Sequence, residues 1–165
     1  MNLSINLGNQ ESALAILNQI KENDYVPFDV KITNSHITSL NGLSGQKIFR
    51  KDTLYINSRT LWEIMQELGG AGSHNYHGLT PNDIFIGLRS LNKPSAVIRV
   101  KNNRYAIISV ELSHFNEPLM IVIETGAELR GKIHANVNKI VTIYPKSDFD
   151  EYIKKIDEKE IVYRK

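Results

Sequence analysis

Residues 94–144 read PSAVIRVKNNRYAIISVELSHFNEPLMIVIETGAELRGKIHANVNKIVTIY and contain four apolar runs that are rich in β-branched residues. Apolar runs bounded by turn-forming residues are typical of β-strands. We predict four strands, at residues 96–101, 104–110, 119–123 and 137–144. The third run is continuously apolar, so we place it in the centre of the sheet. Asn102 and Asn103 fit a two-residue hairpin turn between the first two strands, because Asn tolerates positive φ angles.

Both faces of this sheet are predicted to be apolar, and a sheet of that kind is usually covered on both sides. A two-residue turn would place Ile98 opposite Ile107 on one face, while neighbouring apolar residues occupy the other. On the last strand, the two-residue period puts Ile140, Thr142 and Tyr144 on a common face. Two hydroxyl groups are therefore expected side by side on an otherwise apolar strand.

The rest of the chain is predicted to supply helices that pack on the sheet. Helical spacing and turn signals predict helices at residues 8–22, 58–68, 81–91 and 148–156, short strands at residues 28–32, 53–57 and 161–163, and loops at residues 33–50 and 125–136. Thr80 gives the strongest helix start, because Pro81 follows it and Asp83 can complete a capping box. We predict an α+β fold with an antiparallel four- to five-stranded sheet packed by helices. Residues 1–52 would form a helix–strand appendage, and residues 53–165 the main domain.

Composition sets limits on the class of protein. The chain has 165 residues, a net charge of +2 and no cysteine. The lack of cysteine excludes disulfides, a thiolate nucleophile and a zinc ribbon, and it fits a reducing compartment. The sequence shows no signal-peptide pattern and no apolar run of about 20 residues, so we expect a cytoplasmic protein without membrane contact. Residues 93–146 carry eight Lys and Arg against four Asp and Glu, a modest bias towards anionic partners.

Short motifs of well-known enzymes are missing from the sequence. It contains no glycine-rich phosphate loop, no nucleophile-elbow serine and no helix with paired zinc histidines. His74 and His77 have a metal-like spacing, but no carboxylate lies close by in the sequence. We therefore predict neither a metal nor a cofactor.

Metal-free cleavage of a phosphodiester would require a general base, a general acid and cations around the transition state. Candidate acid–base groups are His77, His114 and His134. Candidate hydroxyl donors are Thr142 and Tyr144. Candidate phosphate contacts are Arg99, Arg104, Arg130 and Lys146. Each of these also has a plain structural interpretation, as a loop residue, a surface charge or a common strand residue. His77 stands out because it lies just before the Thr80-capped helix.

Three segments carry a resemblance to a known family. They are HGLTPNDIFIGLRSLNKPSAVI from His77, NKIVTIYPK from Asn138, and the closing IVYRK. From about residue 54 onwards, the chain resembles the C-terminal domain of phage MuF-type head morphogenesis proteins. The family pattern in the second segment is an Asn, a hydrophobic residue and Ser-Val-Tyr. Here Thr142 replaces the Ser and Ile143 replaces the Val, so the hydroxyl group is retained.

The resemblance implies a small α+β domain similar to the barnase, EndoU, colicin and RelE-like group of metal-independent ribonucleases. It implies that His77 acts as acid or base, that Thr142 and Tyr144 orient the phosphate or ribose, and that Asn138 shapes the end of its strand next to substrate. We expect these groups to share a positively lined cleft.

Three functional hypotheses follow. The first is an RNA-cleaving or RNA-binding effector or toxin of a phage or mobile element, with RNA and an immunity or antitoxin protein as partners. The alternative is a non-catalytic interaction module, inhibitor or antitoxin-like, on the same fold. The weak basic bias favours this alternative slightly, because nucleic-acid-binding domains are usually more positive. ADP-ribosyl transfer ranks last, since no matching arginine and glutamate pattern is visible.

Overall fold

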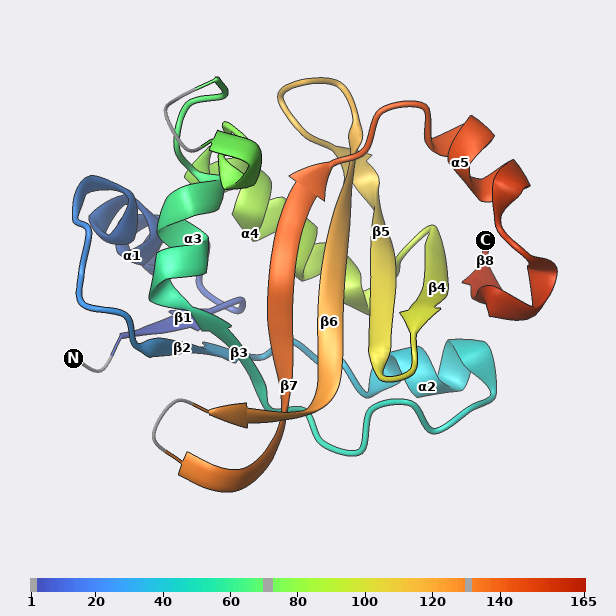
Figure 1. Ribbon diagram of the computed structural model, residues 1–165. Helices are drawn as coiled ribbons and strands as arrows, with labels where there is room; N and C mark the ends of the chain where they lie inside the picture. Colours follow the sequence, from blue (N-terminus) through green and yellow to red (C-terminus); the bar gives the residue numbers. More distant parts are fainter. Residues whose placement is uncertain (1–2, 70–72, 130–131) are drawn as a thin grey trace.

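The computed structural model describes residues 3–69, 73–129 and 132–165 (Figure 1). The strands are β1 (Ser4–Asn6), β2 (Asp29–Thr33), β3 (Leu54–Asn57), β4 (Ala96–Lys101), β5 (Arg104–Leu112), β6 (Pro118–Leu129), β7 (Lys132–Pro145) and β8 (Ile161–Arg164). The α-helices are α1 (Gln10–Glu22), α2 (Ser39–Ser44), α3 (Ser58–Ile64), α4 (Pro81–Arg89) and α5 (Phe149–Lys155). Three short 3₁₀ turns are η1 (Ser73–Asn75), η2 (Ser90–Asn92) and η3 (Glu158–Glu160).

Within the described residues, eight strands form one mixed sheet in the order β1-β2-β3-β7-β6-β5-β4-β8. The pairs β1–β2 and β3–β7 are parallel, and the other pairs are antiparallel. The predicted antiparallel sheet of four to five strands is therefore wrong, although the fold is α+β. The prediction missed the parallel junction of β3 with β7, which connects the N-terminal strands to the sheet. Such a junction joins segments far apart in the sequence and leaves no local pattern. The boundary proposed at residues 52 and 53 stays a prediction.

Both faces of the sheet are covered, as predicted. Helices α1, α3 and α4 bury residues such as Leu17, Leu61 and Leu88 against one face. Helix α5 places Ile153 against Met120 on the other face. The central position of β6, between β5 and β7, is also confirmed.

Strand register differs from the prediction at two bulges. Ile98 lies opposite Ala106 instead of Ile107, because the β4–β5 ladder shifts between Arg99 and Lys101. In β7, Thr142 pairs with Val122 while Ile140 pairs with Ile123, so Val141 is an extra residue.

The bulge at Val141 changes which β7 side chains share a face. Ile140 and Ile143 both join the core beneath α1, α3 and α4. Tyr144 packs with the α5 cluster, and Thr142 shares the face of its partner Val122. The expectation that Ile140 shares a face with Thr142 is wrong, since a bulge reverses the alternation of side chains.

Two segments predicted as loops are ordered elements. Helix α2 lies within residues 33–50, where it buries Leu40. Strands β6 and β7 continue through much of residues 125–136, and their ends bend away from the rest of the sheet (Figure 1). The ladder is irregular at this bend, where Gly126 has a φ of +66°.

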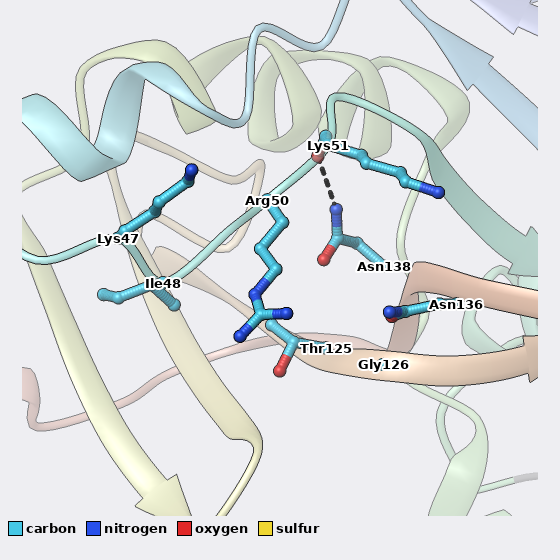
Figure 2. A pocket seen from close by; sticks show the side chains of 8 residues that line it. All are labelled: Lys47, Ile48, Arg50, Lys51, Thr125, Gly126, Asn136 and Asn138. Atoms are coloured by element: carbon cyan, nitrogen blue, oxygen red, sulfur yellow. Dashed lines mark hydrogen bonds between the residues drawn. The ribbon is translucent and has the colours of Figure 1, made fainter.

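Asn138 fastens the segment before β3 to β7. Asn138 is 3% exposed, and its Nδ2 donates to the carbonyl oxygen of Lys51 at 2.7 Å (Figure 2) and to that of Thr53 at 3.0 Å. Burial of Asn138 makes these bonds important, because a buried amide without acceptors loses its hydration without replacement.

We predict that Asn138→Ala lowers the free energy of unfolding by about 1–3 kcal/mol, since the Lys51 carbonyl loses its donor and the Thr53 carbonyl keeps only the main-chain N–H of residue 138, at 3.3 Å. Urea denaturation measures the change. Asn136→Ala, at an exposed position of the same strand, is the matched control and should stay within about 0.5 kcal/mol of wild type. Equal effects of the two substitutions would contradict the role given to Asn138.

Candidate functional site

His77 lies beside the end of β7, held there by contacts with α3. The main chain after it is bonded to the end of α3, because Gly78 donates to the Gln66 carbonyl and Leu79 donates to the Ile64 carbonyl. The His77 Nδ1 lies 2.8 Å from the carbonyl oxygen of Ile143. A carbonyl can only accept, so Nδ1 carries the hydrogen, and Nε2 is left to accept or donate a proton.

The Ile143 carbonyl is accessible because β3 stops short. Strand β3 pairs with β7 from Asn138 to Ile140, and the chain then leaves the sheet at Asn57 to begin α3. Asn57 caps this helix through its side chain, which accepts from the Arg59 N–H. The final residues of β7 therefore present an open edge towards α3, and His77 provides a donor for it.

A cavity of about 500 Å³ lies along this edge. It is lined by Thr60, Glu63, Ile64, Asn75, His77, Val141, Thr142 and Tyr144. The structure thus brings the three predicted catalytic residues to one place. The Thr142 side chain is partly exposed and makes no hydrogen bond with any described residue.

Tyr144 contributes its ring more than its hydroxyl to the cavity. The rings of His77 and Tyr144 meet edge to face, with centroids 5.8 Å apart. The Tyr144 hydroxyl donates to the thioether of Met120, which is a weak acceptor. Burial, together with the nearby Tyr152, raises the pKa of Tyr144. The phenol therefore stays neutral near pH 7 and can act as a donor but not as a base.

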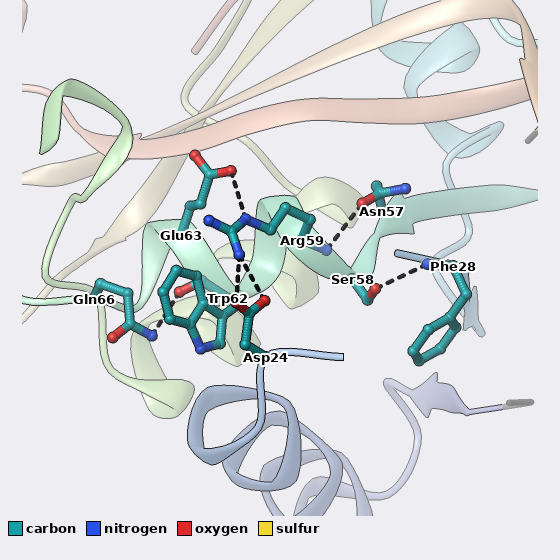
Figure 3. Close-up of polar contacts among 8 residues, drawn as sticks. All are labelled: Asp24, Phe28, Asn57, Ser58, Arg59, Trp62, Glu63 and Gln66. Carbon is teal, nitrogen blue, oxygen red and sulfur yellow. Dashed lines mark hydrogen bonds and ion pairs between the residues drawn. The ribbon is translucent and has the colours of Figure 1, made fainter. Parts of the chain in front are cut away.

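Glu63 is a site residue that the sequence did not indicate. Its Oε1 accepts from Arg59 Nε at 3.2 Å (Figure 3). Arg59 Nη1 in turn lies 2.6 Å from both carboxylate oxygens of Asp24, and its guanidinium stacks on Trp62 at 4.4 Å. The bond to Asp24 raises the pKa of Arg59, so Glu63 stands beside a permanent cation that holds its carboxylate in one orientation.

His114, another candidate acid–base group, has a structural partner instead. Its backbone N–H and its Nδ1 both contact the Asp83 carboxylate. Asp83 is 2% exposed, and it completes the predicted capping box with Thr80. Burial raises the pKa of Asp83, but the bonds from Thr80 and His114 outweigh it, so the net pKa lies below the usual value.

The predicted phosphate contacts are engaged elsewhere. Arg99 pairs with Glu160 at 3.0 Å, Arg104 pairs with Glu124 at 2.9 Å, and the Lys146 ammonium lies 4.4 Å from the centre of the Tyr152 ring. Arg130 lies outside the described residues, as does the side chain of His134. Among the described residues, the lining of the His77 cavity contains no Lys or Arg. The expected positive lining is therefore not found there.

Two further findings concern the described residues alone. They contain no cluster of three or more His, Asp or Glu side chains arranged to hold a metal ion. None of their helices is both long enough and apolar enough to span a membrane.

The fold and site define an α+β protein with a histidine, a carboxylate and a free hydroxyl in one cavity. The phage MuF C-terminal domain family matches residues 70–165, which is more than half of the chain. The chain belongs to this family. Neither the curated proteins nor the solved structures contain a significant match.

We predict that Asp83→Asn lowers stability at pH 7 by about 1–3 kcal/mol. The folded-state pKa of Asp83 lies below the unfolded value of about 3.9, so its stabilisation is present above that pH and is lost as the pH falls through the folded-state value. The difference between wild type and variant should therefore shrink from pH 7 to pH 3, as measured by urea midpoints.

Asp150→Asn is the control for this experiment, since Asp150 is an exposed acid in the first turn of α5. A difference for Asp83→Asn that is the same at both pH values would show that the carboxylate is not stabilised by its partners.

Proposed function

We propose that this protein is a metal-independent endoribonuclease of a phage or mobile element, with the His77 cavity as its reaction site. The observation that carries the proposal is the state of the His77 imidazole. Its Nδ1 is fixed on the Ile143 carbonyl, and its Nε2 remains available in a cavity that also holds a carboxylate and a free hydroxyl. Fixing one ring nitrogen of a catalytic imidazole orients the other for proton transfer.

The groups present fit cleavage by the neighbouring ribose hydroxyl. Glu63 would take the proton from the 2′-OH as that oxygen attacks phosphorus. The protonated Nε2 of His77 would give its proton to the departing 5′-oxygen. The products would be a 2′,3′-cyclic phosphate and a free 5′-OH, and water would restore both groups to their starting protonation states. Thr142 supplies a hydrogen-bond donor for the phosphate oxygens.

Arg59 positions the Glu63 carboxylate in this scheme. The described cavity lining has no cation of its own, but Arg59 contacts Glu63 directly. It is itself neutralised by Asp24, so its main effect is to hold the Glu63 carboxylate in place.

One observation favours the alternative of a non-catalytic interaction module, inhibitor or antitoxin-like. The cavity presents a carboxylate and no Lys or Arg among its described lining residues, which is unusual for a site that binds a phosphate. The two proposals differ in whether RNA is cut and in whether the chain binds one protein partner stoichiometrically.

We predict that the purified protein cuts single-stranded RNA in the presence of EDTA and that His77→Asn slows this reaction by about 10²- to 10⁴-fold. The Asn side chain offers an amide N–H in place of Nδ1 for the Ile143 carbonyl but has no counterpart of Nε2. Gel analysis of labelled RNA measures the rate, and circular dichroism checks the fold.

His74→Asn is the matched control, because His74 is an exposed histidine of η1 and should cut at the wild-type rate. RNA that stays intact with wild-type protein over a range of pH values would remove the enzyme proposal. Unchanged cleavage by His77→Asn would remove His77 from it.

We also predict that Glu63→Gln slows RNA cleavage by about 10²- to 10⁴-fold, because an amide cannot take the proton of the 2′-OH. Gel analysis of labelled RNA measures the rate. Cleavage by Glu63→Gln at the wild-type rate would show that another group is the base.

A further inference from the structure

A second cavity, of about 470 Å³, lies between the segment before β3 and the bent end of the β6–β7 hairpin. Its lining residues are Lys47, Ile48, Arg50, Lys51, Thr125, Gly126, Asn136 and Asn138 (Figure 2). The sequence pattern predicts a polar loop at residues 33–50 and indicates no role for these cations.

Two asparagine side chains fix the backbone that carries the cations. Asn41 donates to the Phe49 carbonyl at 2.7 Å, and its oxygen accepts from the N–H groups of Ile48 and Phe49. On the other side, the Asn138 side chain donates to the carbonyl oxygens of Lys51 and Thr53. The segment is therefore an irregular but well-bonded wall of the cavity.

Phe49 anchors the middle of this segment in the core. Its side chain is fully buried and meets the ring of Tyr105 edge to face at 5.9 Å. Lys47, Arg50 and Lys51 are exposed on either side of it. Their side chains are thus attached to a backbone with little freedom, which reduces the entropy lost when a ligand orders them.

The charges of this cavity are not balanced within the described structure. Lys47, Arg50 and Lys51 form no ion pair with any described residue, and the described lining contains no Asp or Glu. By contrast, Arg99 and Arg104 each have a carboxylate partner. A concave site with several unpaired cations concentrates anions.

The remaining polar groups suit a phosphate-bearing ligand. Arginine and lysine bind phosphate oxygens, arginine through paired N–H groups and lysine as a point charge. Thr125 adds a hydroxyl, and Asn136 adds an exposed amide at the same bend of the hairpin. These neutral groups can contact a ribose or a base beside the phosphate.

We propose that the Lys47, Arg50 and Lys51 cavity binds the phosphate groups of a single RNA strand. The naming of RNA rests on the proposed function. Both cavities border β7, with Asn138 in one and Thr142 in the other. The two residues are four positions apart on β7, which corresponds to about 13 Å in an extended strand. Its cations are the groups that the described lining of the His77 cavity lacks.

The test measures binding in a protein that does not cut. In the His77→Asn background, fluorescence anisotropy with a labelled 12-nucleotide RNA compares Arg50→Gln/Lys51→Gln with Lys154→Gln/Lys155→Gln. Both double variants remove two exposed positive charges, and the second pair lies in α5. The Arg50→Gln/Lys51→Gln variant should bind RNA at least 10-fold more weakly. In a plot of log affinity against log salt concentration, its slope should be smaller in magnitude by about 1.4, which is about 0.7 for each lost phosphate contact on a single strand. The second should change binding less than 3-fold.

Equal effects of the two double variants, or no effect of the first, would overturn this inference. Competition by uridine monophosphate or inorganic phosphate at concentrations similar to that of the RNA would also overturn it, because the cavity would then be a site for small anions. The outcome is separate from cleavage at His77. If Arg50→Gln/Lys51→Gln binds and cuts RNA as the wild-type protein does, only the proposal for the second cavity is refuted. If the wild-type protein binds RNA but does not cut it, only the ribonuclease proposal is refuted.

Discussion

The parallel pairing of β3 with β7 ends at Ile140, and the His77 cavity depends on that ending. The chain leaves the sheet at Asn57 to form α3, so the last residues of β7 have no strand on the side that faces α3, while β6 pairs with them on the other side. Main-chain groups at such an edge need other partners. His77 meets this need at the Ile143 carbonyl, and the space between α3 and β7 becomes the cavity in which its other ring nitrogen is available.

Polar side chains act here mainly as supports for main-chain groups. Asn41 and Asn138 hold the segment before β3, and Asp83 holds the start of α4 together with the loop at His114. Both cavities are consequently built on walls with defined hydrogen bonds rather than on unbonded loops. A site supported in this way keeps its groups in position before a ligand arrives. Strand β7 belongs to both cavities and is the structural link between them.

Features set by neighbouring residues could be predicted from the sequence, as the Asn102–Asn103 turn and the Thr80 capping box show. Features set by distant segments could not. No local pattern reveals that β3 runs parallel to β7 or that an extra residue at Val141 reverses the faces. Glu63 lies four residues after Arg59 and therefore has the pattern of an ordinary helix surface pair. The cationic cavity was hidden for the same reason, because its residues come from a connector and a hairpin that meet only in the fold.

The His77 imidazole is bound through Nδ1 to the Ile143 carbonyl of β7, which leaves Nε2 available in the cavity. Long-range ¹H–¹⁵N correlation spectra of the histidine rings test this arrangement most directly, because the two ring nitrogens have distinct shifts in each tautomer. We expect neutral His77 to be the Nδ1–H tautomer, with a bare Nε2. An Nε2–H tautomer, or a ring that averages between both forms as in a free histidine, would contradict it.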